Sequence, residues 1–341
     1  MFSRKYVWLI TMVMLSINSC KENGVGPGKS NPGRRDYVWN IDTIKTPSVL
    51  LYSLFGTIPD NLWAVGPSGG LDQTIWHFDG TNWKTDNVSR NLTPLSIFGF
   101  ADDNIWLGGM DGKIWNYDGD IWKESVHFSS SKNIGFEDIW GNSPNNIFAV
   151  GYSGYDSNRV SIIAHFDGNK WELNELSELN FDLLRIRKKP QQNIYFLTGL
   201  QTNKTGNDRY AVFEYDGIQN IKSIYEGSNG QESWTFIQLI SNDIYFGIGT
   251  NIYKYVNDNF KLFLDVNDEN FWTGFYGRSE NDLFLVMSDG IKHYNGTDIE
   301  YLYHSSHTMH ILSAILFDSE VFFLAIDPSI GKNIIIRGKL N

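Results

Sequence analysis

Short segments of alternating apolar and polar residues run from about residue 37 to the end of the chain, and turn residues separate them. The segment Leu62–Gly66, which reads Leu-Trp-Ala-Val-Gly, is typical of them. A period of two along four to eight residues predicts a strand with one buried face. No stretch of ten or more residues after residue 40 has a helical period. The pattern therefore predicts an all-β protein.

The strands belong to a repeat of about forty residues. Three plain copies, which start at Phe55, Phe98 and Trp140, have Phe-Gly or Trp-Gly near the start, then a turn with Asp-Asn or Asn-Asn, an apolar strand, an Asp-Gly pair and a Trp. Degenerate copies follow them. Repeats of this length with four short strands each are typical of β-propeller blades. Aromatic residues 39 to 50 positions apart mark seven units: Trp63, Trp106, Phe148, Tyr195, Tyr245, Phe284 and Phe323.

A turn residue followed by glycine recurs between the third and fourth strands of a unit. Asp-Gly and Asn-Gly suit type I′ hairpin turns, in which both central residues have positive φ. We therefore interpret these residues as structural and not as functional. They are Asp79, Asp118, Asp167, Asp216 and Asn295.

The last unit is one strand short. Its expected strands cover residues 311–317, 320–326 and 333–339, and residues 36–44 could supply the missing outer strand. Closing the ring with strands from both termini would leave no open sheet edge. The sequence thus predicts a seven-bladed β-propeller of four-stranded antiparallel blades over residues 37–341, closed by an N-terminal strand.

The repeat resembles the Trp-Gly, Asn-Asp-Val-Trp-Ala-Val-Gly, Asp-Gly and Trp motifs of exported bacterial propeller proteins. It is also distantly similar to the Asp-box repeats of sialidase-type propellers and to Kelch-type repeats. The resemblance covers about residues 37–341. It is specific for architecture and implies no activity.

The N-terminus has the features of an export signal. Arg4 and Lys5 precede an apolar run over residues 6–17, which is too short to span a bilayer, and Cys20 follows closely. Ile-Asn-Ser-Cys at this place resembles the lipobox of bacterial lipoproteins, which implies that Cys20 is lipidated and becomes the first residue. Acyl chains on that cysteine would hold the protein on a membrane.

These features divide the chain into a signal peptide (residues 1–19), a lipidated cysteine with a flexible tether (residues 20–36) and the propeller. The tether is rich in Gly, Pro and polar residues and cannot bury much apolar surface. Cys20 is the only cysteine of the 341 residues, so the propeller can contain no disulfide. We expect a monomer in the cell envelope, anchored to the outer membrane and facing the periplasm or the exterior.

Composition excludes one class of partner. The net charge is −11, and loss of the two positive residues of the signal makes the mature chain more acidic still. A nucleic-acid-binding surface would need a basic patch, so nucleic acid is not an expected partner. Nothing in the sequence implies a cofactor, and no Ser-His-Asp motif or phosphate-binding loop is present.

Aromatic residues that recur in every unit are expected to pack between blades: Trp63, Trp83, Trp106, Trp122, Trp140 and Trp171. Function should lie where the repeats differ. Loops between second and third strands share one face with the connections between blades, and residues 151–159 and 199–209 form unusually long loops there. Flat aromatic rings with a few polar groups suit carbohydrate or peptide binding. The candidate ligand-binding residues are Tyr155, Asp156, Arg159, Arg209, Trp234, Glu269 and Trp272.

His304, His307 and His310 fall in the connection to the last unit and are weak candidates for metal binding, because their spacing matches no standard zinc framework. No metal and no catalytic residue is assigned.

The sequence favours a membrane-anchored, non-catalytic propeller that binds a glycan or an envelope protein. One alternative is a glycoside hydrolase or lyase, which a funnel with two or more carboxylates of raised pKa would favour. Another alternative is a structural part of an outer-membrane assembly, which an extended apolar patch would favour.

Overall fold

The computed structural model describes residues 33–45, 50–67, 69–155, 158–203, 206–228 and 230–341. Cys20, the signal segment and most of the tether lie outside these residues. No helix in the described part of the chain is long and apolar enough to cross a membrane.

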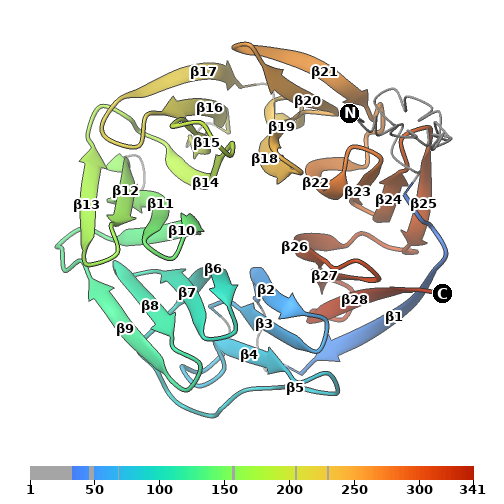
Figure 1. The fold of residues 1–341 in the computed structure, drawn as a ribbon, viewed down its shortest axis with the longest axis horizontal. Coiled ribbons are helices and arrows are strands. Elements are labelled where there is room, and N and C mark those ends of the chain that lie inside the picture. The colour runs from blue at the N-terminus through green and yellow to red at the C-terminus, as the bar shows by residue number, and fades with distance from the viewer. Residues whose placement is uncertain (1–32, 46–49, 68, 156–157, 204–205, 229) are drawn as a thin grey trace, which may run out of the picture. The chain divides into compact units, whose positions relative to one another are not determined.

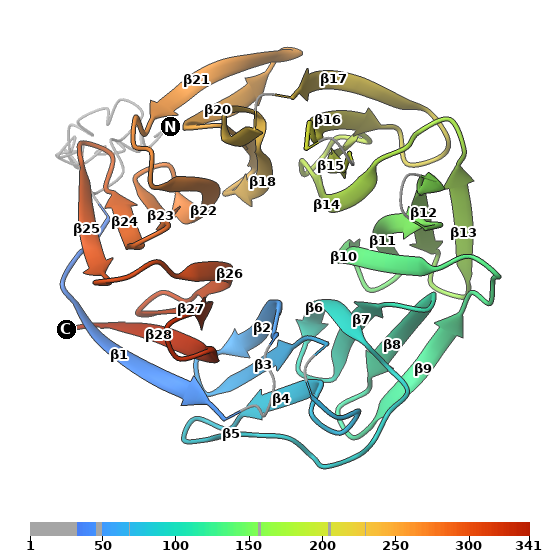
Figure 2. The ribbon, with the colours of Figure 1, turned by 180° about the vertical axis from the view of Figure 1, so that it is seen from behind.

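The described strands form seven sheets arranged as a ring around one axis, as Figure 1 and, from behind, Figure 2 show. The inner strands are β2 (Ser53–Ile58), β6 (Pro94–Ala101), β10 (Ile134–Ser143), β14 (Asp182–Lys188), β18 (Thr235–Ile240), β22 (Phe271–Ser279) and β26 (His310–Leu316). The second strands are β3 (Asn61–Val65), β7 (Asn104–Gly109), β11 (Asn146–Ser153), β15 (Tyr195–Gln201), β19 (Asp243–Ile248), β23 (Asp282–Met287) and β27 (Glu320–Asp327).

The third strands are β4 (Ile75–Phe78), β8 (Lys113–Tyr117), β12 (Val160–Phe166), β16 (Arg209–Tyr215), β20 (Asn251–Val256), β24 (Gly290–Tyr294) and β28 (Lys332–Leu340). The outer strands are β5 (Trp83–Lys84), β9 (Trp122–His127), β13 (Trp171–Leu176), β17 (Ile221–Gly227), β21 (Asn259–Asp265), β25 (Ile299–His304) and β1 (Tyr37–Ile44). A short 3₁₀-helix, η2 (Gly230–Ser233), precedes β18.

The predicted ring closure is confirmed. Strand β1 pairs antiparallel with β28 along its whole length, from Tyr37 opposite Leu340 to Ile44 opposite Asn333. The seventh sheet therefore has the order β1-β28-β27-β26 and takes its outer strand from the other end of the chain.

The packing of the recurring tryptophans agrees with their predicted role between blades. Trp122 of blade 2 meets Trp63 of blade 1 edge to face, with 5.5 Å between ring centroids, and Trp171 of blade 3 meets Trp106 of blade 2 at 5.7 Å. Such pairs contribute about 0.5–1.5 kcal/mol each beyond the area that they bury. Trp122 and Trp171 thus each hold their blade to the preceding one.

The Asp-Gly turns lie where the sequence predicts them, but the type I′ conformation is wrong. At Asp79 only the following Gly80 has a positive φ, of 87°. The Asp79 carboxylate instead accepts the backbone N–H groups of Thr81 and Asn82. A side chain that bonds to its own backbone stabilises a longer turn without a positive φ at the aspartate. The same arrangement recurs at Asp118, Asp167, Asp216 and Asn295.

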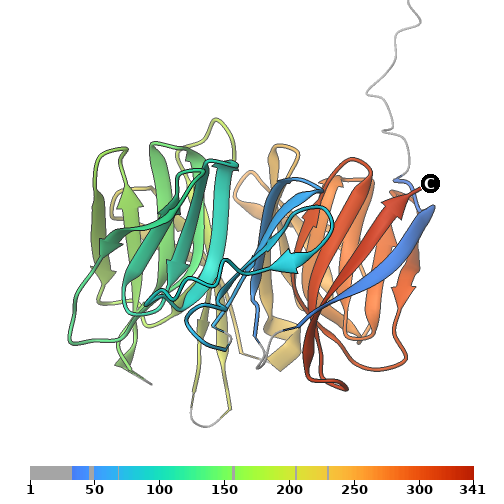
Figure 3. The same cartoon turned by 90° about the horizontal axis from the view of Figure 1, so that it is seen from below.

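The ring has two different faces, which Figure 3 shows in profile. The loop face, at the bottom of that view, holds the connections from second to third strands and from each blade to the next. The turn face, opposite, holds the remaining turns and the C-terminus. Gly33 donates its N–H to Asn281 in the β22–β23 turn at 2.9 Å, and Asn341 donates to the carbonyl of Asp36 at 3.1 Å. Both described ends of the chain therefore lie on the turn face.

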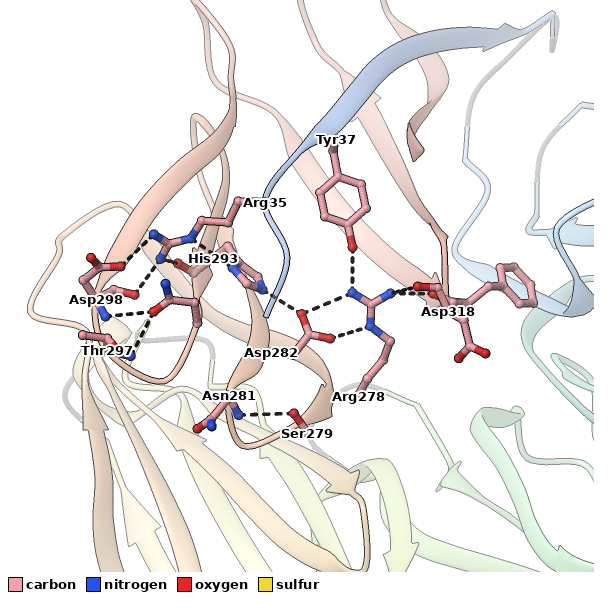
Figure 4. Close-up of polar contacts among 12 residues, drawn as sticks. Arg35, Tyr37, Arg278, Ser279, Asn281, Asp282, His293, Thr297, Asp298 and Asp318 are labelled. Atoms are coloured by element: carbon pink, nitrogen blue, oxygen red, sulfur yellow. Dashed lines mark hydrogen bonds and ion pairs between the residues drawn. The ribbon is translucent and has the colours of Figure 1, made fainter. Parts of the chain in front are cut away.

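Residues 33–36, which the sequence assigned to the tether, are held against blade 6 (Figure 4). Arg35 donates hydrogen bonds to the carbonyl oxygens of His293 and Asp298, at 2.9 and 2.8 Å. Its Nε also donates to Nδ1 of His293 at 3.3 Å, so the imidazole proton is on Nε2, which donates to Asp282 at 2.8 Å. Charge-assisted contacts order a segment that has too little apolar surface to order itself.

Arg278 joins this segment to the ring closure. It forms an ion pair with Asp282 at 2.5 Å and donates to the hydroxyl of Tyr37 at 2.6 Å and to the carbonyl of Phe317 at 2.6 Å. Burial alone would raise the pKa of Asp282, but hydrogen bonds from His293 and Arg278 hold that pKa below its ordinary value. One guanidinium thus connects blade 6, blade 7 and the closing strand.

We predict that Arg278→Ala lowers the free energy of unfolding by about 3 kcal/mol, because it leaves the buried Asp282 carboxylate and the Tyr37 hydroxyl without this partner. Urea denaturation of the full chain measures the change. The control is Arg34→Ala, which removes an exposed ion pair with Asp36 and should have little effect. Equal stabilities of the two variants would contradict this role for Arg278.

Candidate functional site

The structure brings two of the predicted ligand-binding residues together on the loop face. Trp234, directly after η2, and Trp272 of β22 are 6.4 Å apart between ring centroids, and His310 of β26 is 4.8 Å from Trp272. We call these three residues the aromatic cluster. They come from blades 5, 6 and 7, and each of the three side chains is half-buried.

The two predicted arginines make different contacts. Arg159 forms an ion pair with Asp182 of the next blade and stacks at 3.9 Å on the ring of Tyr152. Arg209 bonds within its own blade, to Glu226 and to Gln201. The structure therefore brings Arg159, but not Arg209, into an interblade contact.

The remaining predicted residues form no common site. Tyr155 is 62% exposed in the β11–β12 loop, and Glu269 is exposed in the β21–β22 connection. Asp156 lies outside the described residues.

The three weak metal candidates have separate partners. His304 lies 3.5 Å from Asp289, and His307 lies 3.0 Å from Asp327. His310 faces Trp272 in the aromatic cluster. In the described part of the chain, no group of three His, Cys, Asp or Glu side chains is arranged to hold a metal ion.

A cavity of about 360 Å³ lies on the ring axis, between the ends of the inner strands nearest the loop face. Sequence reasoning missed this site. Its lining residues come from six blades: Tyr52, Ser53, Leu95, Ser96, Glu137, Asp138, Leu184, Arg185, Thr198, Thr235, Phe236, Leu312 and Ser313. We call it the axial cavity.

β-Bulges aim four of these side chains into the axial cavity. The register of four inner strands slips by one residue, which leaves Leu95, Glu137, Leu184 and Leu312 without a partner in the ladder. A bulge re-aims a side chain in this way and is frequent beside binding sites. Glu137 is the one charged residue of these four and takes the place that leucine has in the others. Superposing the repeats in the sequence would have revealed it.

Two ion pairs flank Glu137, and in each of them a carboxylate is neutralised by an arginine. Arg187 lies 2.6 Å from Asp138, whose carboxylate also accepts the N–H of Ile186 at 2.9 Å. Arg159 pairs with Asp182, as described above. Both pairs connect neighbouring blades and are largely withdrawn from solvent.

Glu137 and Arg185 are different. Neither forms a hydrogen bond or ion pair with any other residue that the structure describes, although Arg185 stacks at 4.6 Å over the ring of Phe236. Burial, followed by the negative charge of Asp182, raises the pKa of Glu137 to about 7, and Arg159 and Arg185 oppose this rise. Burial also raises the pKa of Asp182. The cavity thus has a carboxyl group that changes charge near neutral pH.

Glu137→Gln should stabilise the protein at about pH 8 by roughly 2 kcal/mol and leave its stability at about pH 4 unchanged. The folded-state pKa is raised, so folding takes up a proton between the ordinary glutamate pKa and about 7, and stability falls as pH rises through this range. Urea denaturation at both pH values measures the difference. Glu178→Gln, at an exposed position, is the control and should change neither value. A destabilised Glu137→Gln at alkaline pH would show that Glu137 has a stabilising partner.

Fold and site define the chain as a seven-bladed β-propeller with a ligand-sized polar cavity on its axis. No family model and no curated protein matches the sequence. Similar solved structures include YCF48 bound to D1 peptide, with a TM-score of 0.63, 13% identity and coverage of 92% of this chain and 100% of the other. Another is the extracellular domain of a one-component system, BT4673, from B. thetaiotaomicron, with a TM-score of 0.58, 11% identity and coverage of 90% and 43%. At these identities the likeness shows the fold alone.

Proposed function

We propose that this chain is a lipid-anchored protein of the cell envelope whose propeller binds a peptide segment of another protein at its loop face, without catalysing a reaction on it. The observation that carries the proposal is the axial cavity, which opens among charged and aromatic side chains on that face. The cavity is lined mainly by polar and charged side chains, which can fix the orientation of a ligand.

The aromatic cluster supports a protein ligand. Trp234 directly precedes Thr235, which lines the axial cavity, so the aromatic cluster and the cavity both take a residue from this segment of blade 5. Tryptophan is among the residues that contribute most to protein–protein binding, since a large rigid ring loses little entropy on contact. A peptide lying across the cluster would place one residue or end in the cavity. YCF48, a protein of the same fold, binds a D1 peptide.

The position of the described N-terminus supports an anchored arrangement. Residues 33–36 leave the ring on the turn face, next to the C-terminus. A tether from Cys20 to this point would reach at most about 45 Å when fully extended. The point of attachment and the loop face would then lie on opposite sides of the ring.

Hydrolysis of a glycan is the second candidate function, because Glu137 and Asp182 are neighbouring carboxyl groups with raised pKa values. A glycosidase needs one carboxyl group as an acid and a second as base or nucleophile. Asp182 is engaged by Arg159, however, which makes it a poor nucleophile. Shortened oligosaccharide products, lost in Glu137→Gln, would favour this candidate over binding.

The full chain in detergent should bind peptides selected from a random displayed library, and Trp272→Ala should weaken binding about tenfold or more. Calorimetry measures the affinity, and thermal unfolding checks that the variant is folded. Ile218→Ala, at an exposed position in the β16–β17 turn of the opposite face, is the matched control and should bind normally. Binding of polysaccharides but of no peptide would replace the peptide proposal with a glycan ligand. Equal loss in both variants would contradict the loop face as the site.

Replacing the lipobox cysteine tests the anchor separately. Cys20→Ser removes the thiol that would be acylated, so the protein should move from the membrane fraction to the soluble fraction when cells are broken. Immunoblots of the two fractions measure the distribution, and Ser19→Ala serves as the control. An unchanged membrane association of Cys20→Ser would contradict lipid anchoring.

A further inference from the structure

Two uncompensated charges of opposite sign line the axial cavity. Glu137 enters from a bulge of β10 and Arg185 from β14, and neither has an ion-pair partner among the described residues. A charged group that is half withdrawn from water loses hydration that no protein partner replaces. Either charge is therefore a place where a ligand of opposite charge gains more than it would at the exposed surface.

Two hydroxyl groups of the same cavity are also without partners. Thr198 of β15 is fully buried and Thr235 begins β18, and the Oγ1 atoms of both are enclosed without a hydrogen bond. Buried polar atoms in native proteins are nearly always hydrogen-bonded. Two such exceptions in the wall of one cavity indicate a site arranged for polar atoms that a ligand supplies.

The charges also restrict the ligand. Asp138 with Arg187, and Asp182 with Arg159, already form neutral pairs around the cavity. A purely cationic ligand would satisfy Glu137 but leave Arg185 unpaired, and a purely anionic ligand would do the reverse. A ligand that carries both a positive and a negative charge pairs with Glu137 and with Arg185, and the cavity stays neutral.

We propose that the axial cavity binds a dipolar ligand end, an ammonium group and a carboxylate carried by one residue, with the ammonium at Glu137 and the carboxylate at Arg185. This deepens the proposed peptide function and rests on it: the residue is the C-terminal lysine of a bound peptide. The hydroxyls of Thr198 and Thr235 donate to or accept from the same residue. A cavity of about 360 Å³ is at the small end of ligand pockets, so it accepts the end of a chain and not a long segment.

Binding should strengthen as pH rises from about 6 to about 8, because only the ionised form of Glu137 pairs with an ammonium group. Burial sets the ionisation of Glu137 near pH 7, so this range is where the carboxylate forms. The charged and titratable groups that interact with Glu137 are Asp182, Arg185, Arg159, Asp138, Tyr152 and Tyr52. The two other carboxylates in this group, Asp138 and Asp182, each have an arginine partner.

Four small probes test the charges on the full chain in detergent by calorimetry. N-acetyl-Gly-Lys has both charges, its C-terminal amide has only the ammonium, and N-acetyl-Gly-norleucine has only the carboxylate. Free lysine also carries both charges and tests whether the ligand is a free amino acid and not the end of a peptide. The first probe should bind at least about tenfold tighter than the second and third. N-acetyl-Gly-Lys should also match or exceed free lysine, because the preceding residue reaches towards the aromatic cluster.

Three variants assign the contacts. Glu137→Gln should remove the preference for the ammonium and the pH dependence, and Arg185→Gln should remove the preference for the carboxylate. Thr198→Val, which keeps the shape of the side chain, should weaken N-acetyl-Gly-Lys about fivefold without lowering thermal stability, since the hydroxyl has no partner within the protein. The control Glu178→Gln should bind every probe normally.

The outcomes separate this inference from the peptide function. Equal affinities of N-acetyl-Gly-Lys and the two singly charged probes, absence of binding by all four, or an unchanged Glu137→Gln would overturn the dipolar cavity. If library peptides still bind and Trp272→Ala weakens them, the peptide function stands without it. Binding of free lysine alone, lost in Glu137→Gln while no peptide binds, would support the cavity chemistry and remove the peptide function.

Discussion

The pairing of β1 with β28 is the constraint on which the rest of the structure depends. In a propeller each blade packs only on its two neighbours, so the relative position of distant blades is set by closing the ring. The axial cavity takes side chains from six blades, and it has a defined shape only when all seven sheets are held in place. Eight residue pairs between β1 and β28 provide this closure.

Charge reinforces the closure at a point where blade 6 departs from the pattern of blades 1 and 3. In blades 1 and 3 a histidine of the third strand bonds to an asparagine, His77 to Asn61 and His165 to Asn146. Blade 6 has Asp282 at the equivalent place, bonded to His293, and the added charge recruits Arg278. Arg278 then reaches the closing strand. A neutral asparagine could not hold a guanidinium in this way, so the substitution converts a local contact into an interblade connection.

The ring could be predicted from the sequence because its signals are local and repeated. Trp122 and Trp171 recur at fixed places, and their period alone gives the blades and their packing. The turn conformation at Asp79 could not be obtained from the Asp-Gly pair, since the decisive bonds are those of the aspartate side chain to Thr81 and Asn82. The sequence assigned residues 33–36 to the tether because the contacts that order them are made with partners about 260 residues away in the chain.

The candidate site was predictable in part. The sequence singled out Trp234 and Trp272 in the connections between blades, and these two rings lie 6.4 Å apart between centroids, because large aromatic residues outside the repeat need a partner to cover them. Glu137 was missed because Glu-Asp in a strand gives no sign that one carboxylate is paired and its neighbour is not. That distinction arises from the bulge, which turns Asp138 towards Arg187 and Glu137 towards the axis.

The fold alone does not require the charges that Glu137 and Arg185 bring to the axial cavity. The residue after the bulge normally connects inner strands: Ser313 accepts the N–H of Leu54, and Asp138 accepts that of Ile186. Arg185 occupies this position in blade 4 and makes no such bond; it stacks on Phe236 instead. Leucine would serve the fold at residue 137, as it does in three other blades, and serine would serve it at residue 185. Natural sequences depart from the structurally consistent choice mainly where function requires it. Two such departures facing one cavity, with opposite charges, therefore point to a ligand that carries both.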